Sequence, residues 1–478
     1  MMPGGASFSL QQRLQPMSGC RLKPALQTKV RATRVARNLL AFCLAIATAW
    51  GSDLRLIDAL KRRDPKAFDK LLASGADINA AAPDGATALA WAAFLELPDL
   101  AQKLMAAGAK INTANDYGET PLTLALANGD VALSEKLLKA GADWKVTRWN
   151  GETALMIAAG AGSVAEVKML LDLGADVNGA EPKHQQNALM WAASEGHSDV
   201  VDLLIQRGAN ADAISKSGFT ALVFAALKND ASSVKRLLAA GADPNYAIPD
   251  KTKILTIATA NRSYAASMAL LDGGADPNVA DSTGNTPLHM AAQTGTLDLA
   301  KKLLAKGAQL NVRTNPAKAA GFRPAAGELT PLLLAARNAR VEVMHALIEA
   351  GADTKIKGQD GAGLLLAAAV SGRVSAVKFA FEFDKDVKAV DKNGRTAMHE
   401  CMNPGSGATQ TEMTELVQYL ADIGVPLDEK DARGRTAIQT GDVFPLDKPI
   451  QRIAEIIVSR GQTPVQFPKE YVKPGTTR

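Results

Sequence analysis

Residues that carry catalytic or metal chemistry are scarce in this chain. Its 478 residues include three cysteines and five histidines, and aromatic residues make up 5%. The histidines are not paired at the spacing of metal ligands, and a thiolate site needs more cysteines than are present. The sequence contains no C-x-x-C-H motif, no P-loop, no dinucleotide fingerprint and no G-x-S-x-G elbow. We therefore predict that the protein is not an enzyme and holds no cofactor or metal.

Acidic residues are missing from positions 1–49. This stretch holds seven basic residues, namely Arg13, Arg21, Lys23, Lys29, Arg31, Arg34 and Arg37. They account for the formal net charge of +5, because the rest of the chain has 47 basic and 49 acidic residues, a net charge of −2. Nucleic-acid binding rests largely on basic charge. The sequence therefore gives no support to a nucleic-acid partner.

An apolar run, Leu39–Ala47, follows the basic residues, and small residues end it at Ala45, Ala47 and Ala49. This order is typical of a secretory signal peptide, which we place at residues 1–49, with a mature N-terminus near Thr48 or Trp50. The run is short for a transmembrane helix, so a membrane association is expected only if the leader stays uncleaved. A secreted or periplasmic protein is the prediction. An organelle transit peptide and a start at Met17 remain alternatives.

A repeated unit organises the rest of the chain. Its clearest copy reads G-N-T-P-L-H-M-A-A from Gly284, with Gly295 following. Thr286 is suited to cap a helix and Pro287 to begin it. We call the place of Thr286 the capping position; it recurs at Thr87, Thr120, Thr153, Asn187, Thr220, Lys253, Thr286, Thr330, Gly363, Thr396 and Thr436. The steps are 33, 33, 34, 33, 33, 33, 44, 33, 33 and 40 residues.

The motif Thr-Pro-Leu-His-x-Ala-Ala with a 33-residue step resembles the ankyrin repeat. The resemblance implies an all-α solenoid of about twelve helix-turn-helix units with projecting turns. We assign residues 50–463 to this domain, with capping repeats at both ends, and residues 464–478 to an extended tail. We expect a monomer.

Some units depart from the pattern. Lys253 and Gly363 replace the capping threonine, so faster local opening is expected near residues 248–262 and 358–390 than near 150–175. The longer steps place insertion loops at 314–326 and 403–409. The resemblance implies a structural hydrogen bond for His289 and His399. We expect Cys401, Trp91 and Trp191 in the core, because they share positions with small or apolar residues.

In ankyrin-like proteins, partners are usually held by the turn tips and by the inner-helix residues after the alanine pair. In this sequence those positions lie four, three and one residues before the capping position, and seven and eight after it. The predicted partner-binding residues are Phe94, Tyr117, Trp149, Phe219, Leu227, Arg337, Arg395 and Arg433. We expect the rings to anchor a partner and the arginines to orient it. The alternative is that each ring packs on a neighbouring turn.

The resemblance thus implies a non-catalytic protein–protein interaction scaffold, with an unknown protein partner. Together with the leader, it predicts action outside the cytoplasm through the turn tips and the concave helix face. Two alternatives stay open. One is an enzyme or enzyme inhibitor that works through the insertion loops, and the other is a structural spacer.

Overall fold

A computed structural model describes residues 53–318, 327–402, 407–441 and 447–462. The predicted signal peptide and the predicted tail lie outside the described residues, as do parts of both insertion loops. The chain divides into two compact units, one ending at Pro244 and the other beginning at Asn245. The described residues form twenty-four helices, which make twelve pairs, and no strand longer than an isolated bridge. The predicted all-α solenoid of about twelve units is confirmed.

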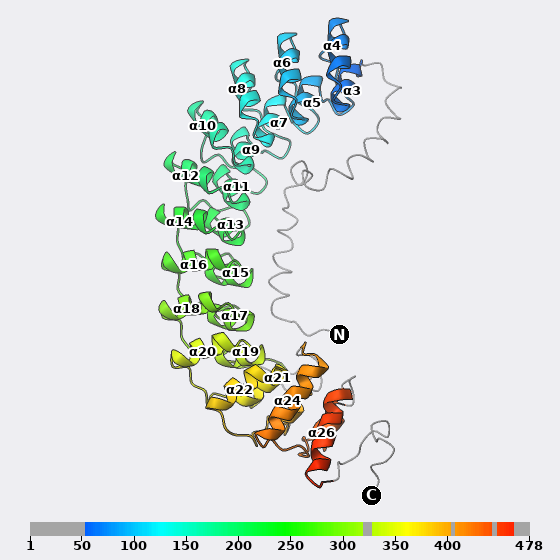
Figure 1. The fold of residues 1–478 in the computed structure, drawn as a ribbon. Coiled ribbons are helices and arrows are strands. Elements are labelled where there is room, and N and C mark those ends of the chain that lie inside the picture. The colour runs from blue at the N-terminus through cyan, green and yellow to red at the C-terminus, as the bar shows by residue number, and fades with distance from the viewer. Residues whose placement is uncertain (1–52, 319–326, 403–406, 442–446, 463–478) are drawn as a thin grey trace. The chain divides into compact units, whose positions relative to one another are not determined.

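Unit 1 holds six helix pairs, in which odd-numbered helices form an inner row and even-numbered helices an outer row (Figure 1). The pairs are α3 (Arg55–Lys61) with α4 (Pro65–Ala73), α5 (Ala88–Phe94) with α6 (Pro98–Ala106), α7 (Pro121–Asn128) with α8 (Val131–Lys139), α9 (Ala154–Ala161) with α10 (Val164–Asp172), α11 (Ala188–Glu195) with α12 (Ser198–Gln206), and α13 (Ala221–Leu227) with α14 (Ala231–Ala239).

Unit 2 repeats this arrangement with six further pairs. They are α15 (Ile254–Ala260) with α16 (Tyr264–Asp272), α17 (Pro287–Thr294) with α18 (Leu297–Ala305), α19 (Pro331–Arg337) with α20 (Val341–Glu349), α21 (Leu364–Val370) with α22 (Val374–Phe383), α23 (Ala397–Cys401) with α24 (Gln410–Asp422), and α25 (Ala437–Gly441) with α26 (Asp447–Ser459). Among the described residues, no helix is both long and apolar enough to cross a membrane.

The capping positions begin the inner helices as predicted. The side chains of Thr87, Thr153 and Asn187 each accept a hydrogen bond from the backbone N–H three residues later. This bond satisfies one of the N–H groups that a helix leaves without a partner at its start. Helices this short are marginal alone and depend on stacking. Where a threonine or asparagine is present, its side chain marks the start of the inner helix, and packing keeps the helix folded.

Small side chains let the inner helices approach one another. Where a repeat has an alanine pair, as at Ala158 and Ala159 in α9, both alanines are fully buried. Cys401 takes the first position of this pair in α23 and is also fully buried. Trp191 is buried, whereas Trp91 is half-buried. The expected core positions of Cys401 and Trp191 are confirmed, and that of Trp91 is confirmed in part.

An asparagine that follows several of the outer helices joins neighbouring repeats. The Oδ1 atom of Asn112 accepts the backbone N–H of Asp143 at 2.8 Å, and its Nδ2 donates to the carbonyl of Gly141 at 3.1 Å. Asn278 makes the same two bonds in unit 2, with Gln309 at 2.8 Å and Gly307 at 3.2 Å. Both bonds reach the following unit, so they fix the step between consecutive repeats.

The two repeats whose capping position holds Lys253 or Gly363, those of α15 and α21, differ from each other. Lys253 makes no side-chain cap, as expected. Gly363 makes none either, but Asp384, just past the end of α22, accepts the N–H of Leu365 at 3.0 Å. The expected absence of a cap from Gly363 is therefore confirmed, but a carboxylate distant in sequence supplies an acceptor for the first turn of α21.

Candidate protein-binding site

The turns before the inner helices are shaped by an acceptor five residues before the capping position. In unit 1, Oδ1 of Asn115 accepts the backbone N–H of Tyr117 at 3.0 Å and that of Glu119 at 2.8 Å. Gly118 has a φ of 72°, and an added Cβ would meet the backbone of Thr147 and of Trp149 at 3.0 Å. A larger residue is therefore excluded at Gly118, and the tip that carries Tyr117 is held in one conformation.

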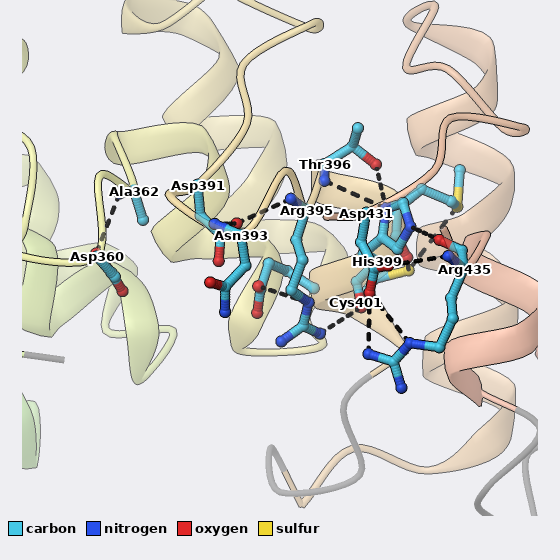
Figure 2. A network of polar contacts seen from close by, with 12 residues as sticks. Asp360, Ala362, Asp391, Asn393, Arg395, Thr396, His399, Cys401, Asp431 and Arg435 are labelled. Atoms are coloured by element: carbon cyan, nitrogen blue, oxygen red, sulfur yellow. Dashed lines mark hydrogen bonds and ion pairs between the residues drawn. The ribbon is translucent and has the colours of Figure 1, made fainter. Parts of the chain in front are cut away.

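The same device recurs in unit 2. Oδ1 of Asp391 accepts the N–H of Asn393 and of Arg395, both at 2.8 Å (Figure 2). Oδ1 of Asp431 does so for Arg433 and Arg435, both at 2.9 Å. Residues in this position thus shape turns, which explains why carboxylates recur there without a catalytic arrangement.

Backbone hydrogen bonds join successive tips of unit 1. The N–H of Asp116 donates to the carbonyl of Asp84 at 2.8 Å, and the N–H of Trp149 donates to that of Tyr117 at 3.1 Å. The side chains of Tyr117 and Trp149 nevertheless point to solvent, with 57% and 68% of their surface exposed. Rings held on a fixed backbone lose little conformational entropy when a partner covers them.

Phe94 is the third exposed ring of unit 1, with 44% of its surface exposed at the end of α5. It meets Trp91 edge-on, with ring centroids 5.7 Å apart. Lys61 covers the other ring of this pair, because its Nζ lies 4.2 Å from the centroid of Trp91. The predicted exposure is confirmed for Phe94, Tyr117 and Trp149.

Phe219 does not belong to this surface. Only 3% of it is exposed, and its ring packs on Phe224 with centroids 5.7 Å apart. The N–H of Phe219 donates to Oγ of Ser215 at 3.0 Å, so the turn directs the ring toward its own helix. The expectation that Phe219 is an exposed anchor is wrong. Leu227, at the end of α13, is half-buried.

The arginines differ in their surroundings. Arg337 pairs with the buried Asp360, and Nε of Arg395 lies 3.3 Å from Oε1 of the buried Glu400. Both guanidinium groups are largely covered, so the expectation that they orient a partner by free charge is wrong. Arg433 is exposed.

Glu400 stands where other units have Trp91, Trp191 or an apolar residue. Burial raises the pKa of Glu400, and the neighbouring Arg395 opposes that rise. Arg395 also donates from Nη2 to the carbonyl of His399 at 3.1 Å. The arginine thus stabilises the negative form of a carboxyl that burial disfavours.

The two histidines of the motif are structural, as the resemblance implied. Nδ1 of His289 accepts the N–H of Thr286 at 3.1 Å, so Nε2 carries the proton. Nε2 donates to the carbonyls of Val312 at 3.1 Å and Leu329 at 3.0 Å, which flank the insertion at 314–326. His399 bonds the carbonyl of Arg435 at 3.0 Å in the same way (Figure 2). Within the described ranges, no group of histidine, cysteine and acidic residues could hold a metal ion.

Glu166 is a buried acid that the repeat pattern did not lead us to expect. Glu166 lies in α10 at a position filled by Leu133, Val200 and Leu299 in other units. It is fully buried, and its Oε1 accepts a hydrogen bond from Oγ of Ser134 in α8 at 2.6 Å. Its Oε2 has no hydrogen-bond partner among the described residues. Alignment of the repeats reveals this charge at an apolar position.

Comparison with known proteins agrees with this architecture. A family model described as "Ankyrin repeats (3 copies)" matches residues 56–148, 127–215, 179–248, 222–314 and 332–431. The chain belongs to the ankyrin repeat family. Ankyrin repeats generally mediate protein–protein interactions, and the matched ranges contain every predicted partner-binding residue except Arg433.

Other comparisons add less. The crystal structure of the human ASB11 ankyrin repeat domain is similar to this chain at 24% sequence identity, with a TM-score of 0.42. The similarity covers 46% of this chain and 96% of that one. A search of curated proteins found no match.

Proposed function

We propose that this ankyrin repeat protein is a non-catalytic scaffold that binds another protein through the turn tips of unit 1. The observation that carries the proposal is the exposure of Tyr117 and Trp149 on neighbouring tips with a fixed backbone. Tyrosine and tryptophan dominate the energetics of protein interfaces. The burial of Phe219 and the ion pairs of Arg337 and Arg395 remove these three residues from the predicted surface, which leaves the two tips with Phe94, Leu227 and Arg433.

The site of action is outside the cytoplasm in this proposal. Its support is the sequence of the leader, where basic residues precede an apolar run and small residues. N-terminal sequencing of the protein purified from the cell exterior or periplasm tests it. A mature N-terminus near Thr48 or Trp50 is expected, and recovery of the full-length chain only from the cytosol would contradict it.

Affinity purification from the producing cells tests the scaffold. We compare the tagged protein with its Tyr117→Ala/Trp149→Ala variant and with Phe383→Ala, which removes a ring that is 43% exposed in unit 2. The expected result is a specific protein that co-purifies with the parent and the control and is lost from the double variant. Circular dichroism must show the same helical content in all three.

Other results would favour the alternatives. Equal recovery of partners by all three proteins would show that the rings are not the binding surface. If the protein turns over a small molecule or inhibits an enzyme, and this activity depends on the insertion loops, the result would favour the alternative of an enzyme or enzyme inhibitor. Absence of any partner would favour a structural spacer.

A further inference from the structure

The exposed rings of unit 1 lie among carboxylates. The tip that carries Tyr117 also presents the exposed Asp116, and the half-buried Asp84 lies on the tip before it; we call Asp84, Asp116, Tyr117 and Trp149 the tip surface. Asp84 and Asp116 are neighbours through the hydrogen bond between the N–H of Asp116 and the carbonyl of Asp84. The carboxylate of Asp116 is exposed and makes no hydrogen bond or ion pair to any other residue that the structure describes.

A buried ion pair leaves the negative charge of these tips uncompensated. Arg148 lies between two tips, with Nη1 2.9 Å from Glu152 and Nη2 3.4 Å from Glu119. Its guanidinium is largely covered, so it offers no charge to a partner. Counted with the two tip aspartates and with Lys183 of the tip that follows Trp149, these groups have a formal charge of −2, from four carboxylates and two cations.

A cation already lies beside one ring. Nζ of Lys183, which belongs to the next tip, is 5.8 Å from the centroid of Trp149. The face of an aromatic ring attracts a cation within about 6 Å of the centroid. The lysine shows that a face of Trp149 attracts a positive group.

Three other tips among the described residues carry a cation. The tip before α13 carries Lys216, and the tips before α23 and α25 carry Lys392 and Arg433. These three described tips therefore lack the negative, aromatic character of the tip surface.

We propose that the tip surface binds an arginine-bearing segment of the partner protein. An arginine of that segment stacks on Trp149 or Tyr117, and Asp116 pairs with its guanidinium. Arginine suits this surface better than lysine, because its planar group both stacks on rings and pairs with a carboxylate through two N–H groups. This inference rests on the proposed scaffold function and names the chemistry of its partner.

The test measures binding of labelled peptides to the whole protein by fluorescence anisotropy. The probe is a short peptide of repeated Gly-Arg-Leu units, and matched peptides replace arginine with lysine, glutamine or glutamate. The expected order of affinity is arginine, lysine, glutamine, glutamate. Equal affinity for the arginine and glutamine peptides would overturn the proposal.

Variants locate the peptide on the protein. Trp149→Ala should weaken the arginine peptide roughly tenfold, and Asp116→Asn should weaken it about threefold and reduce its salt dependence. Lys183→Gln should tighten binding, because it frees the ring and removes a like charge. Phe383→Ala and Asp298→Asn, which change an exposed ring and an exposed acid of unit 2, should have no effect. Unchanged affinity in Trp149→Ala and Asp116→Asn would also overturn the proposal.

The outcome separates this inference from the scaffold proposal. If the ring variants lose the native partner but the peptides show no preference for arginine, the scaffold stands and the arginine chemistry fails. If the arginine peptide binds through Trp149 but the native partner is unaffected by the ring variants, the chemistry stands and the partner binds elsewhere. If neither depends on the rings, both proposals fail.

Discussion

Replacing the buried Glu166 should remove a pH-dependent loss of stability from unit 1. Burial raises the pKa of this carboxyl from 4.5 to about 7, against the hydrogen bonds from Ser134 and Ser163 and with a small contribution from Asp130. The folded state therefore holds the proton more tightly than the unfolded state. The stability that the protonated Glu166 contributes is fully present below pH 4.5 and is lost as the pH rises toward 7.

The size of the loss follows from the shift. One pKa unit corresponds to about 1.4 kcal/mol, so the full shift would amount to about 3 kcal/mol. Local relaxation and water entry reduce the cost of a buried charge, and we expect about 2 kcal/mol. This is a large fraction of the stability of a typical domain.

Two variants make the effect measurable. Glu166→Gln keeps the acceptor for Ser134 but cannot ionise. Ser134→Ala/Glu166→Leu places an alanine and a leucine at these two positions. The equivalent positions one repeat earlier are Ala101 and Leu133, which are both fully buried. Urea unfolding, followed by circular dichroism at pH 4.5 and pH 7.5, gives the difference in unfolding free energy between each variant and the parent.

Between pH 4.5 and pH 7.5, the unfolding free energy of each variant relative to the parent should rise by about 2 kcal/mol. Constant packing effects cancel in this comparison, because they act equally at both pH values. A difference independent of pH would refute the reasoning, since it would mean that Glu166 titrates alike in the folded and unfolded states.

Four further outcomes are expected. Burial lowers the pKa of His289 to about 4, so the stability that the neutral ring contributes is full above pH 6.5 and is lost as the pH falls toward 4. His289→Gln should therefore flatten the dependence of the unfolding free energy on pH in that window. Burial raises the pKa of the Cys401 thiol, so iodoacetamide should modify it only after unfolding; labelling of the native protein would contradict this. Phe219→Ala should cost about 3 kcal/mol in urea unfolding, and a cost near zero would mean that the ring is exposed. Hydrogen exchange at pH 5 should be faster near residues 248–262 than near residues 150–175. Residues 358–390 should exchange early only in the Asp384→Ala variant. Early exchange there in the parent protein would show that Asp384 does not replace the cap.

The helix starts were predictable because their cause is local. A threonine or asparagine bonds an N–H only three residues later, so the capping positions at Thr87, Thr153 and Asn187 can be read from spacing alone. The stacking of the units follows from the same period. Where the acceptor is distant, as with Asp384 and Leu365, no local pattern reveals it.

Exposure at the candidate site was less predictable, because it depends on contacts far apart in sequence. Arg337 looks like a free surface charge until the turn that carries Asp360 folds beside it. Phe219 and Glu119 occupy the same place before their capping positions, yet the phenylalanine turns inward onto Phe224. Tyr117 lies farther out on its turn, so its exposure was predicted correctly.

In the proposed function, a protein partner covers Tyr117 and Trp149. Hydroxyl-radical footprinting tests it most directly, because exposed rings oxidise readily and the modified residue can be identified by mass spectrometry. With the purified partner bound, oxidation of Tyr117 and Trp149 should fall severalfold, while oxidation of Phe383 stays constant. Unchanged oxidation of both rings in a saturated complex would contradict the claim.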